Sequence, residues 1–279
     1  KYKCIKKYNL EKDSENTFEN NGLENIKNVI NLFDKYVIKR DEIYGGKGVL
    51  VHDIDFNDEN GFDIVCEYSK ESDLVIEEKL EGEEYSLMSI CDGFYGIKHF
   101  PPIQDYKRLN DNDKGPNTGG MGCKIDADNS LPFLRPEDII LSEKINEKVI
   151  KSLYKEKSPD SLGYRGILYG SFMKCKDGSI KIIEYNCRFG DPECVIALSL
   201  LKSNFYEICL NILRCEGIRN MELEFDKRAM IGVYMVPQSY PYTKSEKYDI
   251  YLDDIKDNSL TDNGLKDNII FGSVDQTNG

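Results

Sequence analysis

The chain has 279 residues, of which 40% are hydrophobic and 31% charged, as expected for a globular protein of one large or two ordinary domains. Its formal net charge of -13 argues against nucleic acid as a partner, because nucleic-acid binders usually carry a basic face. No apolar run is long enough to span a membrane, and the nine scattered cysteines include no Cys-x-x-Cys pair, so we expect reduced thiols, a cytoplasmic location and no membrane association. A small anion needs only a local pocket of positive charge and is not excluded.

The first part of the chain alternates helical and strand patterns. Residues 22–34 carry apolar side chains at helical spacing and predict a helix. Residues 35–39 and 49–54 predict two strands around a glycine-rich turn. The remaining strands predicted before residue 101 are 74–80, 85–93 and 94–100.

The second part begins with residues 101–122, whose proline and glycine content predicts a long irregular loop. Residues 136–157 predict a helix, and residues 193–215 another. Between them, two strands are joined by a Lys176-Asp177-Gly178 turn. The ranges of these strands are 166–175 and 179–187, and a further strand is predicted within 228–236.

The first chemical motif combines Lys39 with Gly45, Gly46, Lys47 and Gly48. Glycine lets backbone N–H groups approach an anion closely, and two lysines offset phosphate charge. The segment does not have the spacing of a Walker A loop. We interpret it as a phosphate-binding loop; the alternative is a hairpin turn with exposed lysines.

The second motif is an acidic run that contains Glu77, Glu78, Lys79 and Leu80. An edge strand that enters a solvated turn explains its poor alternation of polarity. The functional alternative is a hinge whose backbone pairs with the edge of an adenine, while the Glu84 carboxylate binds ribose hydroxyls.

The third motif lies within residues 104–122, where glycines, a proline and basic residues are concentrated. Such a segment offers backbone donors and cations to a carboxylate or a phosphate, whereas the alternative is a mobile surface loop. The candidate residues are Asp105, Lys107, Gly115, Pro116, Asn117, Thr118, Gly119 and Gly120.

The fourth motif runs from Glu184 to Glu193. On a strand, Glu184 and Asn186 point to the same face, and their oxygens suit Mg²⁺ held between protein and phosphate. Arg188 would share that face if the strand continues, and would stabilise a transferring phosphoryl group. An ordinary turn at a strand end is the alternative.

The chain has only two histidines, His52 and His99, and neither lies near a plausible nucleophile in the sequence. A Ser-His-Asp or Cys-His mechanism is therefore poorly supported. Phosphoryl transfer, which depends on positioning and charge neutralisation, fits the composition better.

Taken in order, the lysine pair, the acidic hinge and the Glu-x-Asn strand resemble the ATP-grasp family. Residues 104–122 (QDYKRLNDNDKGPNTGGMG) and 162–193 are similar to the active-site loop and the signature of its phosphoribosylamine–glycine ligase branch. The resemblance extends over about residues 1–236. It implies an α+β fold in which two subdomains grip ATP, followed by the start of a small β-rich C-terminal domain. The implied ranges are 1–73 for the lid, 74–220 for the catalytic subdomain and 221–279 for the C-terminal part.

The resemblance implies a carbon–nitrogen ligase of purine biosynthesis that uses ATP with Mg²⁺ or Mn²⁺. ATP would phosphorylate the glycine carboxylate, and the amine of 5-phosphoribosylamine would attack the glycyl phosphate, giving glycinamide ribonucleotide. Two alternatives remain: an ATP-binding module without ligase activity, and another ATP-grasp carboxylate–amine ligase.

The resemblance also assigns roles to the candidate residues. Lys39 and Lys47, with Gly45 and Gly46, would hold the ATP phosphates, and residues 77–80 would form the adenine hinge. Glu184 and Asn186 would bind the metal. Catalytic roles fall to Lys107, Arg188 and Asp191, while Asp105, Asp191 and residues 115–122 would border the pocket for glycine and phosphoribosylamine.

The chain departs from the family pattern in three respects. Bulky residues occupy 40–44, and Val195 stands where the signature has Gln. Family members begin with a further α/β domain of roughly 100 residues that helps to bind phosphoribosylamine, a common domain size. We therefore expect a chain without this N-terminal domain and with a shortened C-terminal domain, which is a fragment, a short homologue or one part of a multifunctional purine-pathway polypeptide.

Overall fold

The computed structural model divides the chain into two compact units, Lys1–Met235 and Val236–Gly279. It describes residues 2–5, 17–42, 48–94, 96–153, 163–242, 249–250 and 268–272. Gly45, Gly46 and Lys47 of the predicted phosphate loop lie outside these ranges. The subdomain boundaries expected after residues 73 and 220 stay predictions.

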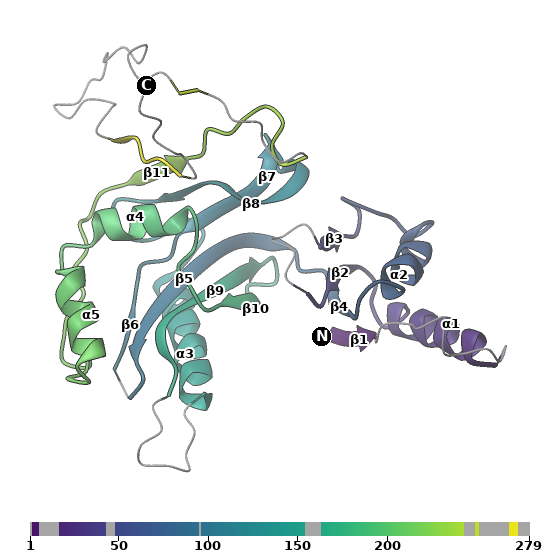
Figure 1. The fold of residues 1–279 in the computed structure, drawn as a ribbon, viewed down its shortest axis with the longest axis horizontal. Helices are drawn as coiled ribbons and strands as arrows, with labels where there is room; N and C mark the ends of the chain where they lie inside the picture. The colour runs from purple at the N-terminus through teal and green to yellow at the C-terminus, as the bar shows by residue number, and fades with distance from the viewer. Residues whose placement is uncertain are drawn as a thin grey trace. The chain divides into compact units, whose positions relative to one another are not determined.

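The first sheet is formed by residues from the N-terminal part of the chain, with two helices packed against it (Figure 1). Its elements are β1 Tyr2–Ile5, α1 Thr17–Ile30, β2 Tyr36–Arg40, β3 Val49–Val51, α2 Gly61–Ser69 and β4 Leu74–Glu78. The strands pair in the order β1-β4-β2-β3, all antiparallel. Ile38 and Ile76 on neighbouring strands are fully buried against Ile26 of α1 and Val65 of α2, as the period of two along a strand requires.

The helix predicted at 22–34 exists, but it begins at Thr17 and ends at Ile30. Turns at residues 31 and 32 follow it. Helix boundaries are the least reliable part of a reading from periodicity, because side-chain spacing does not record where the backbone hydrogen bonds stop.

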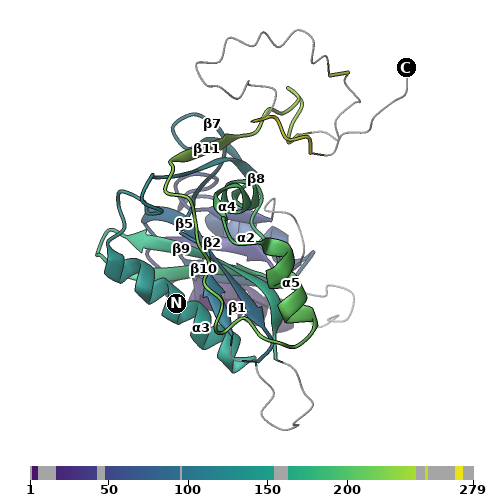
Figure 2. The same cartoon turned by 90° about the vertical axis from the view of Figure 1, so that its left-hand side faces the viewer.

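The second sheet carries the Glu-x-Asn motif and has a long helix along one side (Figures 1 and 2). Its elements are β5 Gly82–Asp92, β6 Ile97–His99, α3 Pro136–Ser152, β9 Arg165–Cys175 and β10 Ile180–Asn186. The strand order is β10-β9-β5-β6, again antiparallel. The predicted hairpin of 166–175 and 179–187 is confirmed, with Gly178 at a φ of 84° in its turn.

The third sheet corrects the sequence analysis. Residues 101–122 are not an irregular loop, because β7 Gln104–Asn110 and β8 Lys114–Ile125 form a hairpin to which β11 Met230–Val233 adds. The turn places Asn112 and Asp113 at φ values of 58° and 57°, the left-handed pair that suits a tight hairpin. Between Tyr106 and Arg108 the register on β8 moves from Gly122 to Asn117, so β8 bulges there.

The glycines of this segment therefore lie on a bulged strand. Gly120 adopts a φ of 147°, and a Cβ there would lie 2.8 Å from the carbonyl oxygen of Asp191. The candidate residues between 115 and 120 lie on β8, and the sequence analysis took their glycine content for a loop because it could not see the pairing with β7.

The helix predicted at 193–215 is divided into α4 Glu193–Leu200 and α5 Phe205–Leu213. Leu201 is extended, and the Asn204 side chain caps the second helix by accepting from the backbone N–H groups of Tyr206 and Glu207. The periodicity of apolar residues continues across the break, which explains why it predicted one helix.

Strand β5 is buried on both faces. Tyr85 and Leu87 pack with Leu131 and Phe172 on the side of α3. Met88 and Ile90 pack with Ile196 of α4 and residues of α5 in the largest cluster. This central strand therefore holds the layers together, and Glu84 near its beginning contacts Lys107 of the site described next.

No helix among the described residues is long and apolar enough to cross a membrane. The nine cysteines, all of which the structure describes, are free thiols.

Candidate active site

The Glu-x-Asn pair lies at the end of β10. The Asn186 side-chain amide donates to Glu184 Oε1 at 3.0 Å, which confirms that the two side chains share a face of the strand. Glu184 is exposed and Asn186 half-buried, so both oxygens are accessible to a ligand. The described residues hold no group of three His, Cys, Asp or Glu side chains arranged for a metal. Two oxygen donors with open positions fit Mg²⁺ or Mn²⁺, which keeps water and substrate oxygens among its ligands.

Lys39 of β2 reaches the same strand from the first sheet. Its Nζ lies 3.3 Å from the carbonyl oxygen of Ile183, the residue before Glu184, and 2.6 Å from Glu77 Oε2. The predicted phosphate lysine is thus brought beside the predicted metal strand. Lys47, its expected companion, lies outside the described residues.

Lys107 of β7 is held by carboxylates. Its ammonium group donates to Glu84 Oε1 and lies 3.8 Å from Asp105 Oδ2, while the Ser171 hydroxyl also donates to Glu84 at 3.0 Å. Burial opposes the charged form of Lys107, but the carboxylates of Glu84 and Asp105 outweigh it, so its pKa is raised. Lys107 therefore stays a cation at neutral pH.

Lys107 and the Glu-x-Asn pair meet in one pocket. Six of the predicted residues line it: Lys107, Gly119, Glu184, Asn186, Arg188 and Asp191. Three residues absent from our predicted site line it as well: Tyr169, Gly190 and Glu193. The pocket thus combines two cations with several carboxylates, an arrangement suited to binding a charged substrate together with a metal ion.

Of the missed residues, Tyr169 had a signal in the sequence and the burial of Glu193 had none. Tyr169 pairs with Asn186 across β9 and β10, so the register of the predicted hairpin points to it. Glu193 begins α4 directly after Pro192, and it is 1% exposed. A buried glutamate at a helix start follows only from packing, which the sequence analysis did not predict.

Asp191 and Arg188 each form a hydrogen bond. The Tyr234 hydroxyl, just after β11, donates to Asp191 Oδ1, and the Tyr234 backbone N–H donates to Met121 O at 2.9 Å. Arg188 Nη1 donates to the carbonyl oxygen of Phe189 at 2.7 Å. Arg188 lies beyond the end of β10, so the condition under which it would share the face of Glu184 and Asn186 is not met, and it reaches the pocket from the segment after the strand.

The bulge of β8 places other candidates around Lys107. The Thr118 hydroxyl donates to the Lys107 carbonyl oxygen at 2.7 Å and accepts from the Gly120 N–H at 3.2 Å. Asn117 pairs with Arg108 in the ladder. The backbone here is therefore fixed by internal hydrogen bonds, which keeps Gly119 at the wall of the pocket.

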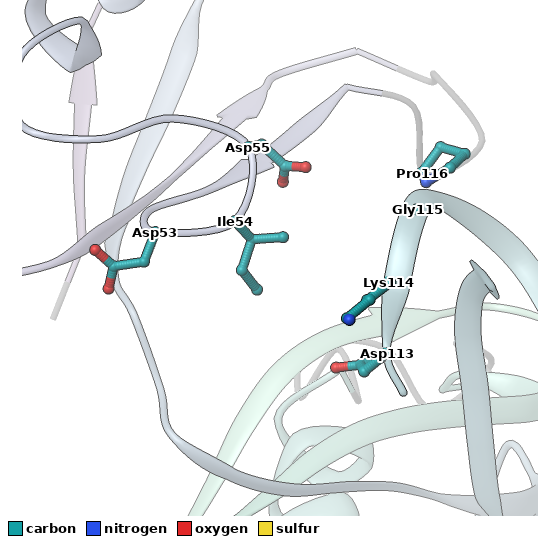
Figure 3. Close-up of a pocket in the computed structure, with 7 residues that line it drawn as sticks. All are labelled: Asp53, Ile54, Asp55, Asp113, Lys114, Gly115 and Pro116. Atoms are coloured by element: carbon teal, nitrogen blue, oxygen red, sulfur yellow. The ribbon is translucent and has the colours of Figure 1, made fainter. Parts of the chain in front are cut away.

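Gly115 and Pro116 lie elsewhere, at the tip of the β7–β8 hairpin. They line a second pocket with Lys114, Asp113 and residues 53–55, which Figure 3 shows across the gap. Arg108 bridges the two sides, because its guanidinium donates to Asp55 at 3.3 Å and to the Gly115 carbonyl oxygen at 3.0 Å. Three aspartates line this pocket, so it is poorly suited to an anion.

The predicted hinge residues lie at the end of β4 and in the link to β5. The Lys79 ammonium donates to the His52 carbonyl oxygen at 2.6 Å and to Asp53 at 3.2 Å. Glu78 lies 3.5 Å from Lys181 Nζ. Leu80 is half-buried. These residues connect the first sheet to the second, and their role in pairing with adenine stays a prediction.

The sheets, the lysines and the Glu-x-Asn strand define the class of protein: an ATP-grasp enzyme fold. The family described as phosphoribosylglycinamide synthetase, ATP-grasp (A) domain, matches residues 2–194. This match covers more than half of the chain, and the chain belongs to that family.

Individual relatives agree. The chain is 37% identical over 224 residues to the phosphoribosylamine–glycine ligase of Methanosarcina barkeri, covering 80% of this chain and 50% of that protein. It is 40% identical over 215 residues to that of Methanocaldococcus jannaschii, covering 74% and 46%. The chain thus spans about half the length of these relatives.

Solved structures show the same fold. The phosphoribosylamine–glycine ligase of Thermotoga maritima is 30% identical, with a TM-score of 0.65 over 86% of this chain and 56% of that one. The ADP complex of an N5-carboxyaminoimidazole ribonucleotide synthetase is similar in fold alone, at 14% identity and a TM-score of 0.55 over 84% and 51%.

Proposed function

We propose that the chain ligates glycine to 5-phosphoribosylamine at the expense of ATP, giving glycinamide ribonucleotide, ADP and phosphate in purine biosynthesis. The observation that supports this most directly is the convergence of Lys107, Glu184, Asn186, Arg188 and Asp191 on one pocket. Family membership supports the choice of substrates, because the relatives are named as phosphoribosylamine–glycine ligases.

ATP would lie between the first sheet and the Glu-x-Asn strand. Lys39 would bind its phosphates from the position beside Ile183. Lys47, Gly45 and Gly46 are assigned to the same phosphates by the resemblance alone. Residues 77–80 would pair with the adenine. The role of Glu84 in binding the ribose hydroxyls stays a prediction; its carboxylate accepts from Lys107 and Ser171, so it would also orient the Lys107 ammonium group.

Glu184 and Asn186 would hold Mg²⁺ or Mn²⁺. When bound, such an ion neutralises phosphate charge and aligns the transferring group. Arg188 and Lys107 would stabilise the charge that develops as the phosphoryl group moves to the glycine carboxylate.

The second step is amide formation. The nitrogen lone pair of 5-phosphoribosylamine attacks the acyl carbon of glycyl phosphate, the carbon–oxygen bond to phosphate breaks, and the nitrogen loses a proton. Asp191, Asp105 and the β8 residues 117–120 would border the two substrates. Asp191 is oriented for this by Tyr234.

The test is ADP release measured with each substrate present or omitted. We expect release to require both glycine and phosphoribosylamine, and Glu184→Gln to lower it more than 100-fold, on the order expected for loss of a metal ligand. Because Glu184 is exposed, the variant keeps the thermal stability of the wild type. An ADP release that neither substrate stimulates contradicts the proposal.

A second candidate function is an ATP-binding module that is inactive alone. The observation that favours it is length, since the chain spans 50% and 46% of two ligase relatives. Calorimetry separates the two functions: ATP binding without any turnover supports the module. The third candidate is a different ATP-grasp ligase. It would release ADP in response to a carboxylate other than glycine, such as bicarbonate. In either case we place the chain in the cytoplasm, where its free thiols stay reduced.

A further inference from the structure

The first sheet and its two helices have an apolar core of their own. Its cluster contains residues from Ile5 to Ile76, whereas the three other clusters among the described residues begin at Tyr85 or later. Within the described part of the chain, no apolar cluster therefore joins the first sheet to the second or third. Since burial of apolar surface is what fixes one layer on another, polar contacts hold the first sheet in place.

Two of these polar contacts lie next to residues of the pocket. One runs from β2 to the carbonyl oxygen of Ile183, the residue before Glu184 on β10. The other joins Asp55, just after β3, to Arg108, the residue after Lys107 on β7. The first sheet thus touches both strands that present Glu184 and Lys107 to the pocket, so a movement of this sheet changes the surroundings of the pocket directly.

The contact between Arg108 and Asp55 is an ion pair with two hydrogen bonds. Arg108 Nη1 donates to Asp55 Oδ1 at 3.3 Å and Nη2 donates to Oδ2 at 3.4 Å. The two side chains are 8% and 22% exposed, so solvent screens the pair only in part. Asp55 is itself fixed, because its Oδ2 accepts from the Val51 N–H at 2.9 Å and its own N–H donates to the Val51 carbonyl oxygen at 2.8 Å. The ion pair therefore ties β7 to the end of β3.

Beside this ion pair the two surfaces do not pack against each other. A cavity of about 460 Å³ separates the end of β3 from the tip of the β7–β8 hairpin (Figure 3). Its charged lining residues are three aspartates and one lysine: Asp53, Asp55, Asp113 and Lys114. Without the Arg108 guanidinium, negative charge predominates around the cavity, and like charges on its two sides repel each other. The ion pair is therefore positioned to keep the two sides together.

We propose that Arg108 is a latch: paired with Asp55, it holds the first sheet over the pocket while nucleotide is bound, and its release lets ADP leave. Arg108 is not among the residues that line the pocket, so it acts through the position of the first sheet and not on the reacting atoms. The inference rests on the proposed function for the nucleotide, because ATP is assigned there to the space between the first sheet and the Glu-x-Asn strand. It does not depend on which acid and amine are joined.

The experiment measures how fast ADP leaves the full chain. A fluorescent ADP analogue is bound with Mg²⁺, and its dissociation is followed by stopped flow after excess unlabelled ADP is added. We expect Arg108→Gln to release the analogue at least about fivefold faster than the wild type, equivalent to about 1 kcal/mol. The association rate constant should change by less than about twofold, since a weakened contact acts mainly on dissociation.

Asp55→Asn removes the other member of the ion pair and should speed release to a similar extent. The double variant should show no more than the larger single effect, because both changes break the same contact. The matched control is Arg219→Gln, the same change at an exposed arginine, which should release ADP at the wild-type rate. A damaged nucleotide site would slow association, whereas loss of the latch does not.

Salt provides a second measurement on the same proteins. Raising KCl from about 0.1 M to about 1 M weakens a partly exposed ion pair. It should therefore speed ADP release more in the wild type than in Arg108→Gln, which has no ion pair left to weaken. Equal salt effects on the two proteins would contradict the latch.

Other outcomes also overturn the inference. Release of ADP from Arg108→Gln at the wild-type rate shows that the ion pair does not retain the nucleotide. Single effects that add in the double variant show that the two residues act separately, and an equal increase in Arg219→Gln shows a general effect of charge. If the wild type does not bind the ADP analogue, the proposed nucleotide site fails together with the latch. A chain that shows the latch effects but no glycine-dependent ADP release supports the latch and rejects only the ligation.

Discussion

The Lys39 ammonium group lies 3.3 Å from the carbonyl oxygen of Ile183, across 144 residues of sequence. The next residue on that strand is Glu184, whose carboxylate accepts from Asn186. The same ammonium group forms an ion pair with Glu77 at 2.6 Å. A cation from the first sheet is therefore fixed beside the oxygen pair of the second, which is the arrangement that a metal-bound triphosphate needs.

Lys39→Ala tests this arrangement. Loss of a charge-assisted hydrogen bond to phosphate costs about 1.5–3 kcal/mol, so the apparent KM for ATP should rise roughly 10- to 100-fold. The KM for glycine should change little. The measurement is steady-state ADP release, with Lys148→Ala on the exposed surface of α3 as the control. An unchanged KM for ATP would place the phosphates elsewhere.

Tyr234→Phe tests the positioning of Asp191. The change removes only the hydroxyl that donates to Asp191 Oδ1, and leaves the backbone hydrogen bond to Met121. Loss of a hydrogen bond to a charged group costs about 1.5–3 kcal/mol, so kcat/KM for the ligation should fall at least about tenfold. We expect the thermal midpoint and the KM for ATP to stay close to wild type.

The control for that variant is Tyr206→Phe, because the Tyr206 side chain is exposed on α5. It should keep wild-type activity. If Tyr234→Phe and Tyr206→Phe are both fully active, the contact with Asp191 has no role in the reaction.

Asp92→Ala should destabilise the fold. The buried Asp92 carboxylate accepts from the backbone N–H groups of Phe94, Gly96 and Ile218. Removing it leaves three donors without their partner, at a cost of about 1–3 kcal/mol for each group that stays dry. We expect urea unfolding to show a loss of at least about 2 kcal/mol, against about 1 kcal/mol or less for Asp63→Ala on α2. Equal effects of the two changes would contradict this account.

His99 makes stability depend on pH. The His99 ring on β6 is partly buried and faces α3, with Nδ1 2.8 Å from the Ser89 hydroxyl and Nε2 3.7 Å from Glu147. Burial lowers the pKa of His99 below its usual 6.5, and the carboxylate of Glu147 opposes this only in part. Below about pH 6.5 the unfolded chain therefore binds more protons than the folded one, so this contribution to stability rises with pH and is complete above pH 6.5.

The measurement compares wild type with His99→Gln, which cannot titrate, by urea unfolding at several pH values from 5 to 8. The difference in unfolding free energy should become more favourable to the wild type as pH rises, and level off above about 6.5. The variant also loses packing, but that loss is independent of pH. A difference that is constant across the range would show that His99 titrates normally.

Much of the site could be predicted from local patterns. The Lys176-Asp177-Gly178 turn between two apolar runs predicted the β9–β10 hairpin, and the period of two placed Glu184 and Asn186 on one face. Both features depend on neighbouring residues, so a sequence records them directly.

Features that depend on distant partners were predicted poorly. The glycines of residues 115–120 indicated a loop, yet pairing with β7 makes this segment part of a bulged strand. Glu193 was missed because its burial comes from packing against Gly190 and Tyr169. Gly115 and Pro116 were expected near Lys107, but they lie at the hairpin tip beside Asp55.

The amino-acid sequence by itself determined the local chemistry of this protein: which residues carry ammonium and carboxylate groups, and the hairpin that presents the Glu-x-Asn pair. Only the tertiary structure decided which of these groups meet, since Lys39, Lys107, Glu193 and Asn186 come from four separate elements. The physical reason is that spacing along a chain governs contacts within a turn or a strand pair, whereas burial of apolar faces determines how sheets and helices assemble.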